Sequence, residues 1–129
     1  MMPLLVEVSA GELVDKITIL ELKLEHIKDP AKLANVRLEH ERLMATFHED
    51  LDECGALAAL SQALKAVNGE LWQIEDDIRA KERAQAFDAE FIALARSVYR
   101  MNDRRAALKR EINQLLRSAI VEEKSYAAY

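Results

Sequence analysis

The sequence is short of the residues that shape loops and cross-links. Its 129 residues include one cysteine, two prolines and three glycines, and only 5% are aromatic. The lone Cys54 cannot form a disulfide within the chain, so nothing in the sequence requires an oxidising compartment. Because aromatic side chains are so few, packing must depend mainly on Leu, Ile, Val and Ala.

Long apolar runs are also missing. The apolar stretch Leu4–Val6 is far too short for a signal peptide and has no basic residue before it. No stretch approaches the roughly 20 apolar residues of a membrane-spanning helix. We therefore expect a cytoplasmic protein of bacterial type with no membrane span.

Basic residues are fewer than acidic ones, 18 against 23, which gives a net charge of −5. A chain this acidic is poorly suited to general binding of phosphate backbones, so nucleic acid is a disfavoured partner. The charge is uneven, however, because basic residues outnumber acidic ones from Asp88 onward.

Metal and cofactor motifs are absent. His26, His40 and His48 show no ligand spacing, and no histidine lies three residues after a glutamate, as di-iron helical bundles require. The sequence therefore predicts no metal site and no cofactor. No catalytic motif stands out either, which makes an enzyme the less favoured class.

What the sequence does contain is the composition of long helices. Half of the residues are hydrophobic and 32% are charged. A chain of this length fits one domain. We predict an all-α fold in a single helical domain, residues 1–129.

Boundary signals divide this domain into four helices. Ser9 and Glu12 have the spacing of a capping box, and Asp29-Pro30 separates the first helix from the second. Before Ser9 we expect a short extended arm that docks on the bundle or on a second subunit. The predicted segments are the arm 1–9, helices 10–28, 30–49, 56–86 and 88–118, and the tail 119–129.

The last two helices carry the clearest periodicity. Apolar residues alternate at spacings of three and four from Leu57 to Ile78, as in a coiled coil, and again from Phe91 to Leu115. A short link near Phe87 makes such helices antiparallel. We predict a long antiparallel helical hairpin covered by the two shorter helices, a four-helix bundle-like arrangement.

Charged residues equally far from the turn should face each other across this hairpin. This places Glu75 near Arg100, and Glu70 near Arg104. We favour ion pairs between the helices over a site for an anionic ligand.

One position of the apolar stripe is occupied by Arg105. A buried guanidinium must be paired, because an unpaired buried charge is strongly destabilising. Its partner can be a carboxylate of another helix, a carboxylate of a second subunit, or a bound ligand, and we favour the two structural options.

Four short stretches together carry a resemblance to a known family: GELVDKITIL (11–20), LANV (33–36), NDRRA (102–106) and EEKSY (122–126). With them the chain resembles, over nearly its whole length, a family of small bacterial proteins classed as a domain of unknown function. Similar segments are also associated with larger proteins that contain tetratricopeptide repeats or glycosyltransferase-like domains. The resemblance implies no activity and no catalytic residue.

Two functions remain open. The first is an interaction or assembly protein, most simply a homodimer, because the stripes, the arm and the aromatic tail offer more apolar surface than one small core needs.

The second is a small-molecule binder or enzyme acting on an anionic ligand, such as a nucleotide or phosphosugar, at a polar cluster between helices. Lys16 and Arg105 would hold the anion, Trp72 would stack on it, and Glu75 or Asp15 would act as a base or metal ligand. The candidate ligand-binding residues are Asp15, Lys16, Asn35, Trp72, Glu75, Asn102, Arg104, Arg105 and Tyr126.

Overall fold

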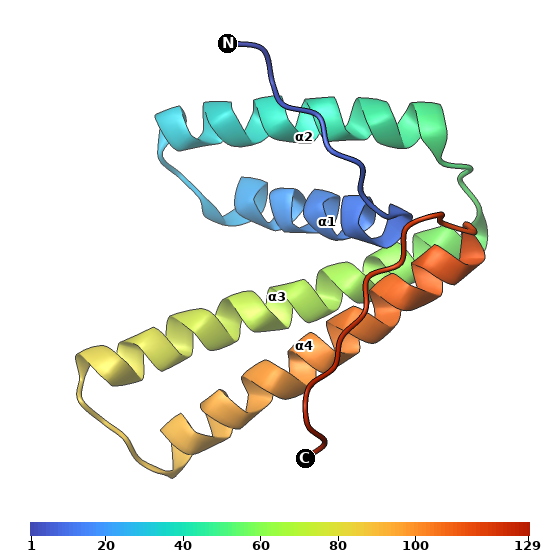
Figure 1. Cartoon of the computed structure of the whole chain (residues 1–129). Coiled ribbons are helices and arrows are strands. Elements are labelled where there is room, and N and C mark those ends of the chain that lie inside the picture. Colours follow the sequence, from blue (N-terminus) through green and yellow to red (C-terminus); the bar gives the residue numbers. More distant parts are fainter.

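The structure, a computed structural model, describes residues 1–129 and contains four helices and no strands (Figure 1). The helices are α1 (Ala10–His26), α2 (Pro30–Asp50), α3 (Gly55–Arg83) and α4 (Ala89–Leu115). The predicted all-α, four-helix bundle-like fold with a long α3/α4 hairpin is confirmed. None of the helices is long and apolar enough to cross a membrane.

Side-chain caps fix the starts of three helices. The Ser9 hydroxyl accepts a hydrogen bond from the amide of Glu12 (3.0 Å), and Asp29 accepts one from Ala31 (3.2 Å). Asp88 caps α4 in the same way. Each cap satisfies an amide that the first turn leaves without a partner.

The hairpin turn begins at a residue whose backbone has the left-handed helical conformation. Gln85 has a φ of 56°, a conformation that commonly ends helices, and the chain then reverses toward Asp88. Lys81 braces the turn through ion pairs with Asp88 (2.9 Å) and Glu90 (2.6 Å).

α1 is the central element of the fold. It packs against α2, α3 and α4, whereas α2 packs against α1 alone (Figure 1). The expectation that both short helices cover the hairpin therefore holds only for α1. The reason lies in α1 itself, which buries Leu13, Val14, Ile17, Leu20 and Leu22 and so has apolar surface for both neighbours.

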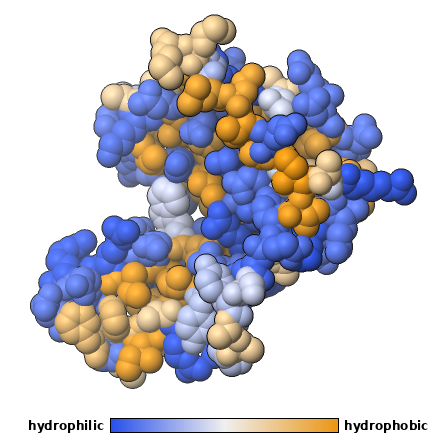
Figure 2. All heavy atoms as spheres, in the orientation of Figure 1, coloured by the Kyte–Doolittle hydropathy of each residue, from blue (hydrophilic) through white to orange (hydrophobic).

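The core is confined to the end of the hairpin that α1 covers. There Val14, Leu57, Leu64 and Ile112 form one buried cluster. In contrast, none of the residues 69–111 is buried. We call the part of the hairpin formed by residues 69–104 the projecting limb, and Figure 2 shows hydrophobic side chains gathered on it.

The N-terminal arm and the tail have no helical structure. Met1 to Val8 are all exposed. The tail after Ser118 runs back along α4 (Figure 1).

Candidate functional site

Arg105 reaches from α4 to a carboxylate of α1. Its Nε donates a hydrogen bond to Asp15 Oδ1 (2.9 Å), and its Nη2 donates one to Asp15 Oδ2 (2.5 Å). Asp15 is 1% exposed, while the Arg105 side chain is 31% exposed. The hydrogen bonds to Asp15 raise the pKa of the guanidinium above its ordinary value. Of the three possible partners for Arg105, the structure thus shows a carboxylate of the same chain.

The third helix completes this pair. Asn68 Nδ2 on α3 donates to Asp15 Oδ1 (2.9 Å) and to the Thr18 hydroxyl (3.0 Å). Thr18 donates in turn to the backbone carbonyl of Asp15 (2.8 Å). No buried side-chain polar atom in the chain is left without a partner. The buried charge is therefore fully satisfied, and it joins α1, α3 and α4.

Two further contacts continue the line between α1 and α4. The Lys109 ammonium pairs with Glu12 (2.6 Å), and the Gly11 amide donates to Asn113 Oδ1 (2.6 Å). Arg105, Lys109 and Asn113 are spaced by four residues and so share one face of α4. We call these two contacts, together with Asp15–Arg105, the α1–α4 polar seam.

Gly11 is required by the closeness of the two helices. A Cβ atom at this position would lie 2.5 Å from the backbone oxygen of Lys109, closer than real Cβ contacts come. The glycine therefore allows the amide to reach Asn113.

The tail contacts the seam at the N-terminal end of α1. The Ser9 hydroxyl donates to Glu122, and Asn113 Nδ2 donates to the same carboxylate (3.0 Å). Burial raises the pKa of Glu122, but the hydrogen bonds from Ser9 and Asn113 and the nearby Lys109 charge outweigh it and leave the pKa below its ordinary value. Further along, Lys124 pairs with Asp103 and lowers the pKa of that carboxyl.

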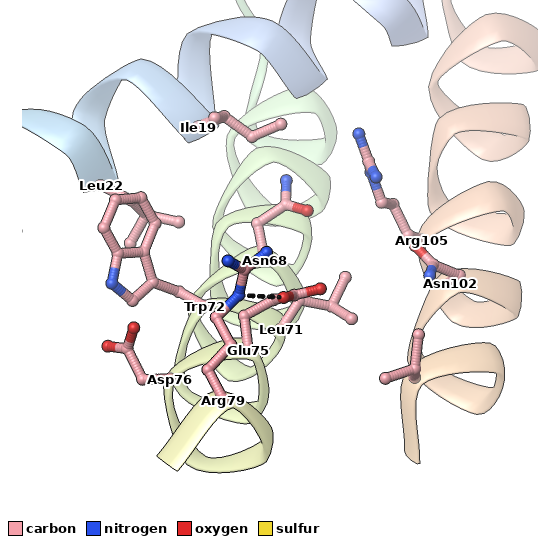
Figure 3. A pocket seen from close by; sticks show the side chains of 11 residues that line it. Ile19, Leu22, Asn68, Leu71, Trp72, Glu75, Asp76, Arg79, Asn102 and Arg105 are labelled. Atoms are coloured by element: carbon pink, nitrogen blue, oxygen red, sulfur yellow. Dashed lines mark hydrogen bonds and ion pairs between the residues drawn. The ribbon is translucent and has the colours of Figure 1, made fainter. Parts of the chain in front are cut away.

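A cleft of about 540 Å³ lies beside Arg105, where α1, α3 and α4 diverge (Figure 3). Its apolar wall comes from Ile19, Leu22, Leu71, Trp72 and Val98. In Figure 3, Trp72 lies on the α3 side with Leu22, opposite Asn102 and Arg105 on α4.

The charges of this cleft are mostly paired. Glu75 holds Arg79 through an ion pair one turn apart (3.1 Å), drawn dashed in Figure 3. Arg105 is held by Asp15. Asp76, which also lines the cleft, has no ion pair. Neither arginine is therefore left as an uncompensated positive charge for an anionic ligand.

The structure brings some of the nine candidate residues together and separates others. Trp72, Glu75, Asn102 and Arg105 line one cleft, and Asp15 lies behind Arg105. The other four lie elsewhere: Lys16 is exposed and 3.7 Å from Glu12, Asn35 is exposed on α2, Arg104 is exposed on α4, and Tyr126 is in the tail.

Tyr126 lines a second, larger space of about 1,290 Å³ between the tail and α4. The rings of Tyr99 and Tyr129 meet there, with centroids 4.8 Å apart. Asn102 and Arg105 line both spaces and thus stand between them.

An ion pair between α3 and α4 does form beside the turn, between Lys81 and Glu90, but the two expected farther along the hairpin do not. Glu75 pairs with Arg79 of its own helix and not with Arg100, and no ion pair joins Glu70 to Arg104. A pair one turn apart needs less ordering of the side chains. In addition, Glu75 lines the cleft, whereas Arg100 lines neither the cleft nor the space under the tail.

Sequence reasoning missed five residues: Gly11, Lys109 and Asn113 of the seam, and Asn68 and Glu122, which contact it. One signal was available, because the four-residue spacing of Arg105, Lys109 and Asn113 marks a continuous polar stripe on a helix. The positions of Asn68 and Glu122 carry no such pattern.

The model of a family of unknown function, DUF6165, matches residues 4–129, which include most of the arm, the four helices and the tail. The chain belongs to DUF6165. The resemblance to a family of unknown function is confirmed. Three of the four motifs contain residues of the α1–α4 polar seam or of the tail contacts in this DUF6165 protein, namely Gly11, Glu12, Asp15, Asp103, Arg105, Glu122 and Lys124. No curated protein and no solved structure matches the chain.

Proposed function

We propose that this DUF6165 protein is a self-associating helical assembly protein, and that a second copy covers its projecting limb. The observation that carries the proposal is the absence of any buried side chain between residues 69 and 111. The apolar periodicity nevertheless continues through this region, with Leu71, Ile74 and Ile78 on α3 and with Phe91 and Leu94 on α4. A helix pair with such stripes gains stability when another element covers them.

The surface area supports the same proposal. A monomeric protein of 14.6 kDa exposes about 6,900 Å² by the usual scaling with mass. This chain exposes 9,085 Å², about 2,200 Å² more. Obligate dimers bury roughly 2,000–5,000 Å² in total, so the excess exposed area of two such chains is large enough for a stable interface.

Large apolar side chains are exposed on the limb itself. Phe87 at the turn is 53% exposed, and Ile92 on α4 is 57% exposed. Ile92 is suited to a test, since its solvent exposure means that a charged replacement leaves the core of the single chain intact.

The test compares Ile92→Glu with Leu38→Glu in analytical ultracentrifugation. Leu38 is a matched control because it is 52% exposed and lies on α2, away from the limb. We expect Ile92→Glu to weaken the dimer by about 100-fold in Kd, since a charge at the centre of an apolar interface costs as much as a typical hot spot. Leu38→Glu should leave Kd within about twofold.

Equal Kd values for both variants and the wild type would contradict the limb as the interface. Circular dichroism of each variant at high dilution checks that the helices are retained. A loss of helix in Ile92→Glu alone would show that Ile92 supports the fold of one chain, which also contradicts the proposal.

A ligand in the Trp72 cleft is the second candidate function. The cleft's volume falls within the range of small-molecule sites, and Trp72, the only tryptophan, lies in its wall. We place it second because both cleft arginines already pair with carboxylates. Titration with inorganic phosphate, followed by Trp72 fluorescence, tests the anionic ligand. A saturable change that Asn102→Ala abolishes and Asn35→Ala does not would favour it, and no change in the wild type would exclude phosphate.

A further inference from the structure

Two stripes of opposite charge run along the projecting limb without partners. On α4, Arg96, Arg100 and Arg104 are all exposed and form no ion pair. On α3, Glu70 is exposed and forms none, and Asp77 has only a hydrogen bond from Gln73 (2.9 Å). None of these charged residues lines the cleft beside Arg105 or the space under the tail.

Each stripe occupies one face of its helix. Arg96 follows Ile92 by four residues and so lies beside it on α4, and Arg100 and Arg104 continue at the same spacing, each rotated by about 40° around the helix. Glu70 and Asp77 are seven residues apart, two turns, and therefore share a face of α3. Their separation along the helix is about 10.5 Å, close to the roughly 12 Å between Arg96 and Arg104.

A two-fold axis makes such an arrangement self-complementary. In a symmetric dimer, when residue i of one copy contacts residue j of the other, residue j of the first also contacts residue i of the second. One acidic and one basic stripe on the same limb thus supply two equivalent sets of ion pairs. Charge complementarity of this kind selects the partner and fixes the register.

We infer that the second copy lies on the limb with its α4 arginines against the α3 carboxylates of the first copy, and with its own carboxylates against the first copy's arginines. This inference rests on the proposed self-association and specifies the interface that performs it. The two copies pair their limbs as a four-helix arrangement, with Ile92 at its apolar part and the charged stripes beside it.

Charge reversal tests this arrangement with two chains. The acidic chain carries Arg100→Glu and Arg104→Glu, and the basic chain carries Glu70→Lys and Asp77→Lys. In a homodimer of either chain, like charges meet at both sets of contacts. In a mixture, the reversed arginine positions of the acidic chain meet the reversed carboxylate positions of the basic chain, and the unchanged stripes also match.

Each chain alone should therefore associate at least tenfold more weakly than the wild type, while an equimolar mixture should form a heterodimer with near wild-type affinity. A single chain that carries all four reversals should regain the homodimer. Sedimentation of fluorescently labelled chains separates the homodimers from the heterodimer. The affinities should fall as salt rises, because salt screens exposed ion pairs.

Controls on α2 reproduce the change in net charge. Arg37→Glu with Arg42→Glu matches the acidic chain, and Glu39→Lys with Glu41→Lys matches the basic one, since all four residues are exposed and form no ion pair. Both controls should dimerise as the wild type does. Equal weakening in the controls would show that net charge, and not the limb, governs association, and would overturn the inference.

The outcomes separate this inference from the proposed function. A wild-type chain that is monomeric overturns both. A dimeric wild type whose two reversal chains still form homodimers, or whose mixture stays monomeric, overturns the pairing of stripes and leaves self-association standing.

Discussion

The carboxylate of Asp15 and the guanidinium of Arg105 meet in a two-point contact although 90 positions separate them in the chain. The contact joins the first helix to the last, and Asn68 joins it to α3. Together with the rest of the α1–α4 polar seam, this pair holds α1 against one end of the hairpin. None of the residues 69–111 is buried, and the projecting limb within this stretch is the surface that we propose for assembly.

Asp15→Asn should destabilise the chain by about 2–3 kcal/mol. The substitution leaves Arg105 half-buried without its counter-charge, and breaking a buried pair at one partner is costly. This loss is smaller than that for breaking a fully buried ion pair, because the Arg105 side chain is 31% exposed. Urea unfolding followed by circular dichroism measures it. The exposed Asp50→Asn is the control, with an expected change within about 0.5 kcal/mol, and a similarly small change for Asp15→Asn would contradict the structural role of the pair.

Gly11→Ala should destabilise the chain by about 2 kcal/mol, although alanine is the better helix former. The added Cβ would lie 2.5 Å from the backbone oxygen of Lys109, so α1 and α4 must move apart. Gly55→Ala is the matched control, because nothing lies within 4 Å of a Cβ there. Thermal unfolding should show a lower midpoint for the first variant and an unchanged or higher one for the second. Equal midpoints would mean that α1 and α4 are not in close contact at Gly11.

The tail should detach from α4 in acid. The pKa values of Glu122 and Asp103 lie below their ordinary values of 4.5 and 3.8 in the folded chain. A group with a lowered folded pKa contributes stability that is complete above its ordinary pKa and is lost as the pH falls through the lower folded value. Tail docking should therefore be complete above pH 4.5 and lost progressively below it.

Amide chemical shifts of residues 119–129 follow this detachment by NMR. In Glu122→Gln with Asp103→Asn, the same shifts should be weakly dependent on pH and already resemble a free tail at neutral pH. Tail shifts that stay constant down to about pH 3 in the wild type, while the helices remain folded, would contradict the role of these carboxylates.

The helices themselves could be predicted from local patterns. Ser9, Asp29 and Asp88 act as caps, and the alternating apolar positions of α3 and α4 place these helices in one hairpin. Such signals involve neighbours within one or two turns, which a sequence displays directly.

Contacts between distant segments could not be derived in the same way. The sequence marked Arg105 as a charge that needs a partner, but three partners remained possible because periodicity does not say which helix faces it. The sequence also did not indicate that α2 would pack on α1 alone, or that α1 would cover only one end of the hairpin. Coverage of that kind depends on how whole helices pack.

The candidate site was divided by the fold for the same reason. Trp72, Glu75, Asn102 and Arg105 share a cleft because α3 and α4 run side by side, whereas Asn35 lies on α2, which does not reach the hairpin. Asn68 was missed because a single polar residue beside an apolar stripe is common on any helix.

The molar mass of the wild-type chain in solution tests the central claim most directly. Light scattering over a range of concentrations should give twice the 14.6 kDa of the single chain. The mass should fall toward the single-chain value only on strong dilution. A mass of 14.6 kDa at every concentration up to about 100 μM, which would require a binding energy weaker than about −5.5 kcal/mol, would contradict self-association through the projecting limb.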